Sequence, residues 1–476
     1  MKHKLISLGS LALLCPSVLA LTSCSNNTIV IANFESYMST DLIDAVEKKF
    51  HDQAQFLYYG TNEDIDRKFD RNYDVATPSS YQAINMIKRG SIHRIDWSVF
   101  DLYKPDQEHI TKNKINNGHD ALKLFTKPIQ IIIEEQSKDI FQPDANGYIP
   151  NLLDYCIPYF LQSWIFAYKG DKIKDLEQNS TWVQTIDKIS NKSATGDKRF
   201  KNTKLACIDD VRSLYGISHL IENERNAIPA EDWTVNPSEN DNRYQYEITY
   251  KNLKDSFLKN SFWLNSDSGS VLNSFADPNG DIGAFAYNGD ILYACQGADT
   301  YDVDYNNDNV HVITPNQNLL AIDMMVINAK ANGEHLNKIY EMLKFMLLDG
   351  VDSTNEITER DKNGSYVKGP MCNFESVQYT DVFKTINDYV NKKDNDSRPA
   401  QDSYFGLMFD WEKEEGETDE AYNKRINNQY AKINLWLSIY NVPDMSSYIN
   451  FIEKPINGHQ KSDMYGAYVK TIKNGL

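Results

Sequence analysis

Residues 29–34 read Ile29-Val30-Ile31-Ala32-Asn33-Phe34, a short and almost wholly apolar run that predicts a buried strand. The run opens a regular alternation of patterns: a helix at 41–50, a strand at 55–59, a helix at 62–69, a strand at 73–77 and a helix at 81–89. Strands that alternate with helices at this rhythm are typical of α/β proteins. The sequence therefore predicts an α/β fold with a mostly parallel sheet.

The alternation continues through the middle of the chain and is interrupted towards its end. Residues 154–168 form a long aromatic and apolar segment, and 351–368 are polar and loop-like. The charged stretch 391–424, with acidic residues at 412–420, predicts a solvated surface insertion. Further predicted elements are a strand at 204–209 leading into a helix from Asp210, a strand at 283–287, a turn at Asn288-Gly289 followed by a helix, a strand at 321–328 and an amphipathic helix at 337–348.

The N-terminus has the pattern of a lipoprotein leader. A cationic start is followed by an apolar run from Leu5 to Ala20, which contains Pro16 and is short for a membrane span. The next residues, Leu21-Thr22-Ser23-Cys24, resemble a bacterial lipobox. This resemblance implies a signal peptide at 1–23, a diacylated Cys24, and a tether at 24–28 that holds the protein at the outer face of the membrane. The alternative is an uncleaved N-terminal anchor helix with an incidental Cys24.

Composition limits the classes of function. The formal net charge is -18, and loss of Lys2 and Lys4 with the leader makes it -20. An acidic chain is a poor binder of nucleic acid or anionic lipid. With 41% hydrophobic residues the chain can build real cores, and the roughly 450 residues after the leader suffice for two or three domains.

Several signatures of metal sites and enzymes are missing. No phosphate-binding loop, nucleophile elbow or zinc helix is found. The four cysteines after Cys24 lack a Cys-x-x-Cys pair, so that one or two disulfides and buried free thiols both remain open. Residues 302–308 resemble the start of a calcium loop, but Asn307 replaces its glycine and Ile313 its closing glutamate. We therefore interpret 302–308 as a polar loop, and expect neither metal nor cofactor. The four cysteines are Cys156, Cys207, Cys295 and Cys372.

Aromatic residues and carboxylates follow several predicted strands, at the positions where α/β sheets place their ligands. Such a set suits an organic polycation, because carboxylates hold ammonium groups and aromatic faces attract them. Each member has an alternative role in the core or as a helix cap, and for the adjacent pair Asp209-Asp210 the alternative is that one of the two caps the next helix. Neighbouring strand residues point to opposite faces, so both aspartates serving one reaction centre is not expected. The candidate ligand-binding residues are Phe34, Glu35, Tyr37, Ser79, Tyr81, Asp210, Tyr287 and Asp323.

From about Ile29 to Leu348 the chain resembles the spermidine/putrescine-binding proteins of bacterial ABC importers. The most specific motif is Tyr73-Asp74-Val75-Ala76-Thr77-Pro78-Ser79-Ser80-Tyr81. The other motifs are Asn33-Phe34-Glu35-Ser36-Tyr37, Ile157-Pro158-Tyr159, Ile208-Asp209-Asp210-Val211-Arg212, Asn265-Ser266-Asp267, Tyr287-Asn288-Gly289-Asp290 and Ile322-Asp323. The resemblance implies a periplasmic-binding-protein-like fold, with two α/β lobes that close like a hinge around an interlobe ligand cleft.

The resemblance also assigns a first lobe to 29–168 and about 324–370, and a second lobe to about 169–323 and 371–476. It implies that Asp210 and Asp323 each hold an amine, with Phe34 and Tyr287 standing where the family has tryptophans. Tyr37, Ser79 and Tyr81 match family contacts in the first lobe. Three departures redistribute the charge: Ser213 replaces a glutamate, Ala321 a tryptophan, and Glu35 a threonine. Beyond about Asp349 the likeness is lost.

The expected function is that of a lipid-anchored, monomeric capture subunit without catalysis. It would bind a polyamine outside the cell and deliver it to the membrane permease of an ABC importer. One alternative is a binding protein for another solute, such as a sugar, an amino acid or Fe(III). A second is a surface adhesin that retains the fold, and an enzyme such as a glycosidase is the least supported.

Overall fold

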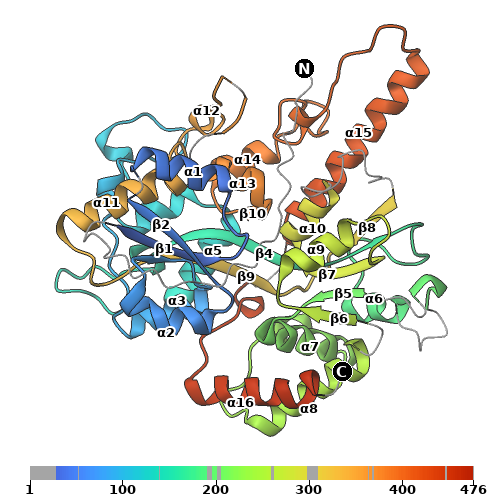
Figure 1. Cartoon of the computed structure of the whole chain (residues 1–476), viewed down its shortest axis with the longest axis horizontal. Helices are drawn as coiled ribbons and strands as arrows, with labels where there is room; N and C mark the ends of the chain where they lie inside the picture. The colour runs from blue at the N-terminus through green and yellow to red at the C-terminus, as the bar shows by residue number, and fades with distance from the viewer. Residues whose placement is uncertain are drawn as a thin grey trace.

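The computed structural model shows a mixed α/β protein with two lobes that share one continuous sheet (Figure 1). Within the described part of the chain, ten strands form this sheet. The structure describes residues 28–51, 53–138, 140–189, 196–200, 205–258, 262–296, 309–362, 364–366, 369–444 and 448–474.

The first lobe is built on the strand-helix alternation at the beginning of the chain. Strand β1 (Ile29–Phe34) pairs in parallel with β2 (Ala54–Tyr59) and with β3 (Val75–Ala76). Side chains of β1 such as Ile29 and Ile31 are buried in the core, as the apolar run predicts. The carboxyl ends of these parallel strands therefore meet at one edge of the sheet.

Two long strands cross between the lobes. Strand β4 (Cys156–Lys169) pairs through its first half with β9 (Leu320–Ile327), and through its second half with β7 (Gly283–Tyr287) and β8 (Val310–Ile313). The change of partner falls between Ser163, which faces Leu320, and Trp164, which faces Tyr287. All these pairings are antiparallel, so the prediction of a mostly parallel sheet is wrong for its centre.

The second lobe repeats the parallel arrangement. Strand β5 (Leu205–Ile208) lies between β6 (Phe262–Asn265) and β7 and is parallel to both. The turn expected at Asn288-Gly289 is absent, because helix α10 begins directly at Asn288. The helices of both lobes are α1 (Thr40–Lys49), α2 (Asn62–Asn72), α3 (Ser80–Lys88), α4 (Gly118–Ala121), α5 (Lys127–Ser137), α6 (Trp182–Ile189), α7 (Val211–Arg225), α8 (Arg243–Leu253), α9 (Ser268–Ala276), α10 (Asn288–Cys295), α11 (Gly333–Leu343) and α12 (Thr354–Ile357).

The C-terminal part of the chain packs against both lobes. Helix α13 (Gly369–Val377) packs against α1, strand β10 (Thr380–Asp381) pairs with β4, and α14 (Lys384–Val390) packs against α12. These contacts place 371–390 beside α1, α12 and the first half of β4, and α13 also packs against α10. The chain then enters the long projecting helix α15 (Asp419–Tyr440), which begins inside the predicted insertion 391–424 and packs on α10 (Figure 1).

The last segment returns to the junction of the lobes. The short helix η11 (Tyr448–Phe451) packs against α5 of the first lobe, and Ile452 forms a bridge with Leu320 at the start of β9. Helix α16 (Gly458–Tyr468) then packs along α8 of the second lobe. In Figure 1 the red segment before α16 passes between the two lobes.

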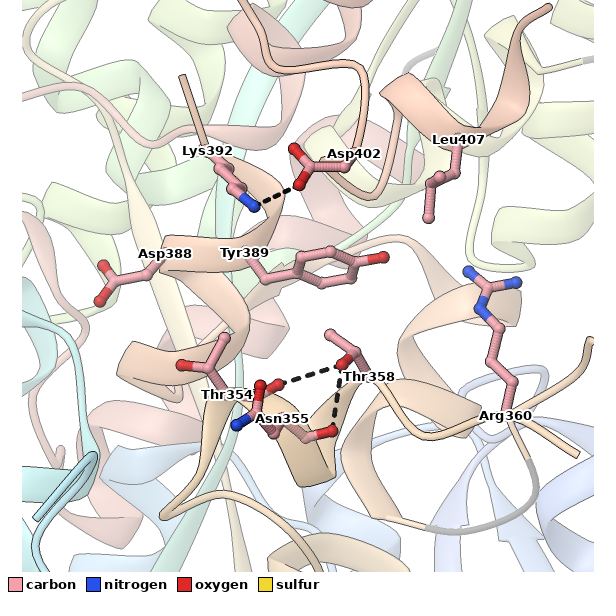
Figure 2. Close-up of a pocket in the computed structure, with 9 residues that line it drawn as sticks. All are labelled: Thr354, Asn355, Thr358, Arg360, Asp388, Tyr389, Lys392, Asp402 and Leu407. Atoms are coloured by element: carbon pink, nitrogen blue, oxygen red, sulfur yellow. Dashed lines mark hydrogen bonds and ion pairs between the residues drawn. The ribbon is translucent and has the colours of Figure 1, made fainter. Parts of the chain in front are cut away.

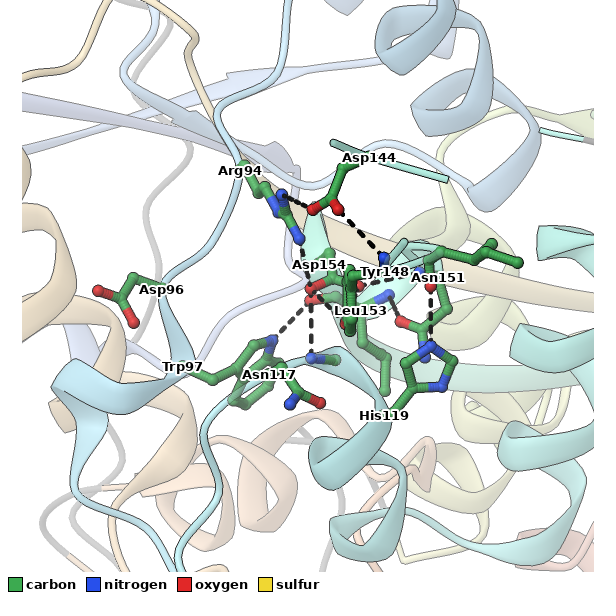
Figure 3. A network of polar contacts seen from close by, with 12 residues as sticks. Arg94, Asp96, Trp97, Asn117, His119, Asp144, Tyr148, Asn151, Leu153 and Asp154 are labelled. Carbon is green, nitrogen blue, oxygen red and sulfur yellow. Dashed lines mark hydrogen bonds and ion pairs between the residues drawn. The ribbon is translucent and has the colours of Figure 1, made fainter. Parts of the chain in front are cut away.

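A buried polar network anchors the first-lobe end of β4. Figure 3 shows several side chains converging on Asp154, two residues before the strand begins. Its carboxylate accepts hydrogen bonds from the Tyr148 hydroxyl at 2.8 Å and from the Asn151 backbone N–H at 2.9 Å, while the Arg94 guanidinium lies 3.8 Å away. His119, in the same network, contacts the Ile149 carbonyl oxygen. These bonds satisfy a buried carboxylate, so the network holds β4 in place.

The structure also settles the state of the cysteines, which the sequence left open. All four cysteines that it describes are buried free thiols. No helix of the described ranges is both long and apolar enough to cross a membrane. The calcium-like segment 302–308, the leader and Cys24 lie outside the described residues.

Candidate functional site

Asp323 occupies the centre of the junction between the lobes, in the middle of β9. Its carboxylate accepts three hydrogen bonds: 2.7 Å from the Ser79 hydroxyl, 2.9 Å from the Tyr37 hydroxyl and 2.9 Å from Gln162 Nε2. Ser79 ends the segment that follows β3, and its backbone forms a bridge with Asp323. The first-lobe sheet therefore brings residues that are 286 positions apart, Tyr37 and Asp323, into direct contact.

The Asp323 carboxylate is 3% exposed, and its partners are all neutral groups. Burial raises its pKa to about 6, an effect that the hydrogen bonds from Ser79 and Tyr37 oppose and that the nearby charge of Asp210 reinforces. A buried carboxylate without a cation is unfavourable. Asp323 is thus a buried carboxylate whose hydrogen-bond partners in the described part of the chain carry no positive charge.

Aromatic rings surround Asp323 on the first-lobe side. The Tyr37 ring makes edge contacts with Phe34 at 6.1 Å, with Tyr159 at 5.3 Å and with Tyr379 at 5.1 Å between ring centroids. The Tyr159 hydroxyl donates to the Tyr37 carbonyl oxygen at 2.7 Å, which holds the loop after β1 in place. These rings form a wall that can pack against methylene groups and face a cation.

The second lobe contributes Asp210 at the N-terminus of α7. As the alternative reading expects, Asp210 caps this helix, accepting a 2.6 Å hydrogen bond from the Ser213 backbone N–H. Burial raises the pKa of Asp210. The preceding Asp209 points elsewhere and pairs with Tyr468 and Lys473, in agreement with the expectation that the two carboxylates do not act together.

Ser213 connects Asp210 to two further residues. Its hydroxyl lies 3.1 Å from the Tyr287 hydroxyl and 3.5 Å from Glu453 Oε1. Tyr287 ends β7 and makes an edge contact with Trp164, where β4 enters the second lobe. Ser213 therefore lies beside the carboxylate of Glu453. In the family that the sequence resembles, the position of Ser213 is itself a glutamate.

Glu453 is the site residue that the sequence reading missed. Its side chain is 7% exposed, and burial raises its pKa to about 8, with Arg212 opposing the shift and Asp210 and Asp323 reinforcing it. Glu453 lies beyond the part of the chain that carries the resemblance. The sequence feature that could have marked Glu453 as buried is its position directly after the apolar residues Phe451-Ile452. Gln162 was missed as well, and its corresponding feature is a single amide within the long apolar strand β4.

The predicted residues fall into two groups. Phe34, Tyr37, Ser79 and Asp323 form the first-lobe side, and Asp210 and Tyr287 form the second-lobe side. Burial raises the pKa of Tyr81, and the charges of Glu453, Glu63 and Asp210 reinforce the shift. Glu35 is exposed, and its charge acts on Tyr58 at the surface. The structure therefore does not bring Glu35 to the carboxylates of the junction. Cys24 lies outside the described residues.

A separate hollow of about 460 Å³ opens between α12 and α14 (Figure 2). Its charged groups are already engaged, since Lys392 pairs with Asp402 and the guanidinium of Arg360 bonds to Gly364 and Tyr366. The predicted site residues are not part of its lining. Within the described residues, no cluster of histidine, cysteine or acidic side chains could hold a metal ion.

The fold and the junction define a class of protein: two α/β lobes joined by crossing strands, with polar and aromatic residues gathered where they meet. This confirms the predicted architecture of two α/β lobes. The chain belongs to the family described as "Hypothetical lipoprotein (MG045 family)", whose model matches residues 1–473. No curated protein sequence matches the chain.

Solved structures of solute-binding proteins resemble the chain at low identity. PotD of Streptococcus pneumoniae, a spermidine/putrescine ABC transporter substrate-binding protein, is 13% identical, with 86% of this chain and 99% of that chain covered and a TM-score of 0.45. The TpPotD lipoprotein of Treponema pallidum is 15% identical, with 67% and 80% covered and a TM-score of 0.45. UgpB of Mycobacterium tuberculosis, in complex with glycerophosphocholine, is 11% identical, with 95% and 94% covered and a TM-score of 0.48.

Proposed function

We propose that this protein is the substrate-binding subunit of an ABC importer, and that it captures a polyamine outside the cell and delivers it to the membrane permease. In this role it binds without catalysis and acts as a monomer. The observation that carries the proposal is the gathering of three carboxylates, Asp323, Asp210 and Glu453, among aromatic rings at the junction of the lobes.

The hydrogen-bond partners of these carboxylates within the described residues are all neutral. Asp323 accepts from Ser79, Tyr37 and Gln162, Asp210 from Ser213, and Glu453 lies beside the Ser213 hydroxyl. A buried carboxylate gains most from a charged hydrogen-bond donor, which in this proposal the ligand supplies. Ammonium groups joined by methylene chains meet both requirements, because the chains pack on the rings of Tyr37 and Tyr287.

The location of the protein follows from its N-terminus. In the proposal, the leader is cleaved and lipid on Cys24 holds the protein at the outer face of the cell membrane. Membership in a lipoprotein family is consistent with this anchor. Anchoring keeps the binding protein at high effective concentration beside the permease.

Isothermal titration calorimetry of the purified protein with putrescine and with spermidine tests the proposal. We expect saturable binding of at least one of the two. Absence of heat with both, at a concentration where the protein is folded by circular dichroism, would contradict it. Sugars and amino acids serve as comparison ligands, and binding of one of them alone would assign the site to another solute.

A further inference from the structure

A buried arginine lies next to the three carboxylates. Arg212, in the first turn of α7, is 6% exposed, and its charge opposes the rise that burial causes in the pKa of Glu453. Its Nη2 donates to Asn236 Oδ1 at 2.9 Å and to the Lys454 carbonyl oxygen at 3.1 Å. The remaining nitrogens, Nε and Nη1, are buried without a hydrogen-bond partner.

Arg212 and Asn236 together hold the backbone on both sides of Glu453. Asn236 Nδ2 donates to the Ile452 carbonyl oxygen at 2.9 Å, and Asn236 Oδ1 accepts from the Lys454 backbone N–H at 2.6 Å. We call Arg212 and Asn236 the Glu453 clamp. Because the clamp fixes its neighbours, Glu453 keeps its place at the junction, and Arg212 keeps a permanent positive charge nearby.

Building on the proposed function, we infer that Arg212 sets the charge of the preferred ligand. With Asp323, Asp210 and Glu453 ionised, the positive charge of Arg212 leaves the junction with a net charge of -2. This net charge matches a dication such as putrescine better than a trication such as spermidine. Outside this set, the exposed Glu63, whose charge also acts on Asp210, pairs with Lys461 at 3.0 Å, and the buried Asp290 and Asp381 accept hydrogen bonds from the Tyr379 hydroxyl and the Phe383 backbone N–H.

The physical reason is desolvation. An ammonium group that leaves water recovers its hydration free energy only where a carboxylate balances it. Two ammonium groups find that balance at the junction, whereas a third would meet the positive field of Arg212. The cost of the unbalanced charge lowers affinity and is independent of ligand length.

The test compares three ligands by calorimetry: putrescine, spermidine and N1-acetylspermidine. The last has the length of spermidine but the charge of putrescine, and so separates charge from size. For the unaltered protein we expect putrescine and N1-acetylspermidine each to bind about tenfold or more tighter than spermidine, an order of magnitude typical of one unbalanced buried charge. Equal or tighter binding of spermidine than of N1-acetylspermidine would overturn the inference.

Two substitutions at Arg212 provide matched variants. Arg212→Gln removes the charge but keeps hydrogen-bond donors for the clamp, and Arg212→Lys keeps the charge. We expect R212Q to shift the preference towards spermidine by about tenfold, and R212K to retain the preference for dications. An unchanged ratio of affinities in folded R212Q would overturn the inference.

A double variant restores the net charge of the junction. R212Q combined with E453Q brings the net charge back to -2, so we expect the preference for dications to return. The three-ligand comparison on the unaltered protein needs no substitution, and so decides the matter even where R212Q does not fold. Binding of spermidine with higher affinity would refute the charge rule while leaving the polyamine function intact, whereas absence of binding by all three amines would refute both.

Discussion

At the scale of single residues, the site depends on carboxylates that are buried before any ligand arrives. Asp323 is held by Ser79, Tyr37 and Gln162, which fix the direction of its two oxygens. Neutral donors stabilise the carboxylate without neutralising it, so its attraction for a cation is retained. Glu35, in contrast, is exposed, and water screens its charge.

Replacing Asp323 by Asn therefore has a large predicted effect on binding. We expect D323N to weaken polyamine binding by about 1.5–3 kcal/mol, because it removes one charge-assisted hydrogen bond from the ligand. Calorimetry measures this change. Glu35→Gln is the matched surface variant, with an expected loss below about 0.5 kcal/mol. Unchanged affinity in D323N, or an equal loss in E35Q, would show that Asp323 does not bind an ammonium group of the ligand.

At the scale of elements, helix α10 supports the aromatic wall from behind. It begins directly after β7, and a Cβ atom at Gly289 would lie only 2.4 Å from the Tyr379 ring. Tyr379 in turn donates a 2.6 Å hydrogen bond to Asp290 and contacts the Tyr37 ring. The absence of a side chain at Gly289 thus lets the start of α10 set the position of Tyr379.

Gly289→Ala tests this contact. We expect it to lower the free energy of unfolding by about 1–3 kcal/mol, since the added methyl group overpacks the Tyr379 ring. Urea denaturation followed by circular dichroism provides the measurement. Gly60→Ala serves as control, because a Cβ at Gly60 meets nothing within 4 Å. Equal stability of both variants would mean that Tyr379 moves freely.

The Glu453 clamp is a second contact between elements that can be tested. Asn236→Ala removes the hydrogen bonds to Ile452 and Lys454, so we expect it to weaken polyamine binding by about 1 kcal/mol by releasing Glu453. If Asn236 acts through Glu453, the same change made in an E453Q background has a smaller effect. Additive losses in the double-mutant cycle would show instead that Asn236 acts on general stability.

At the scale of the whole molecule, several buried carboxylates make stability depend on pH. Burial raises the pKa of Glu453 and of Asp381 to about 8, of Asp290 to about 7 and of Asp323 to about 6, against ordinary values of 4.5 for Glu and 3.8 for Asp. The folded protein consequently binds more protons than the unfolded chain across this interval. Their contribution to stability is therefore complete at low pH and is lost as the pH rises through the folded-state values.

We therefore expect the melting temperature of the ligand-free protein to fall between about pH 5 and about pH 8.5, and polyamine affinity to rise over the same interval. The affinity rises because a cation binds to the ionised form of Glu453 and Asp323. Differential scanning fluorimetry with and without ligand measures both effects. Glu453→Gln removes one titrating group and so flattens both profiles; an unaltered pH profile in E453Q would contradict the role of Glu453.

The sequence predicted much of the first-lobe half of the site and less of the second. Tyr37 and Ser79 follow strand ends, where topology alone brings side chains together, whereas Asp323 lies in the middle of β9. Glu453 could not be recognised because its neighbours at the site, Ser213 and Arg212, lie some 240 residues away. The antiparallel centre of the sheet was missed because β4 is buried throughout, so its apolar run does not reveal which strands lie beside it.

The sequence by itself determined the α/β class, the order of the first strands and helices, the buried character of β4 and three aromatic residues of the candidate site, Phe34, Tyr37 and Tyr287. These are local properties, set by the period of apolar residues and by short motifs. Only the tertiary structure decided where β4 changes partners, that 371–390 pack beside α1 and the first half of β4, and that Glu453 lies beside Ser213. The physical reason is that charge balance in a buried site depends on which distant segments meet there, and the junction of the two lobes joins segments from the beginning, middle and end of the chain.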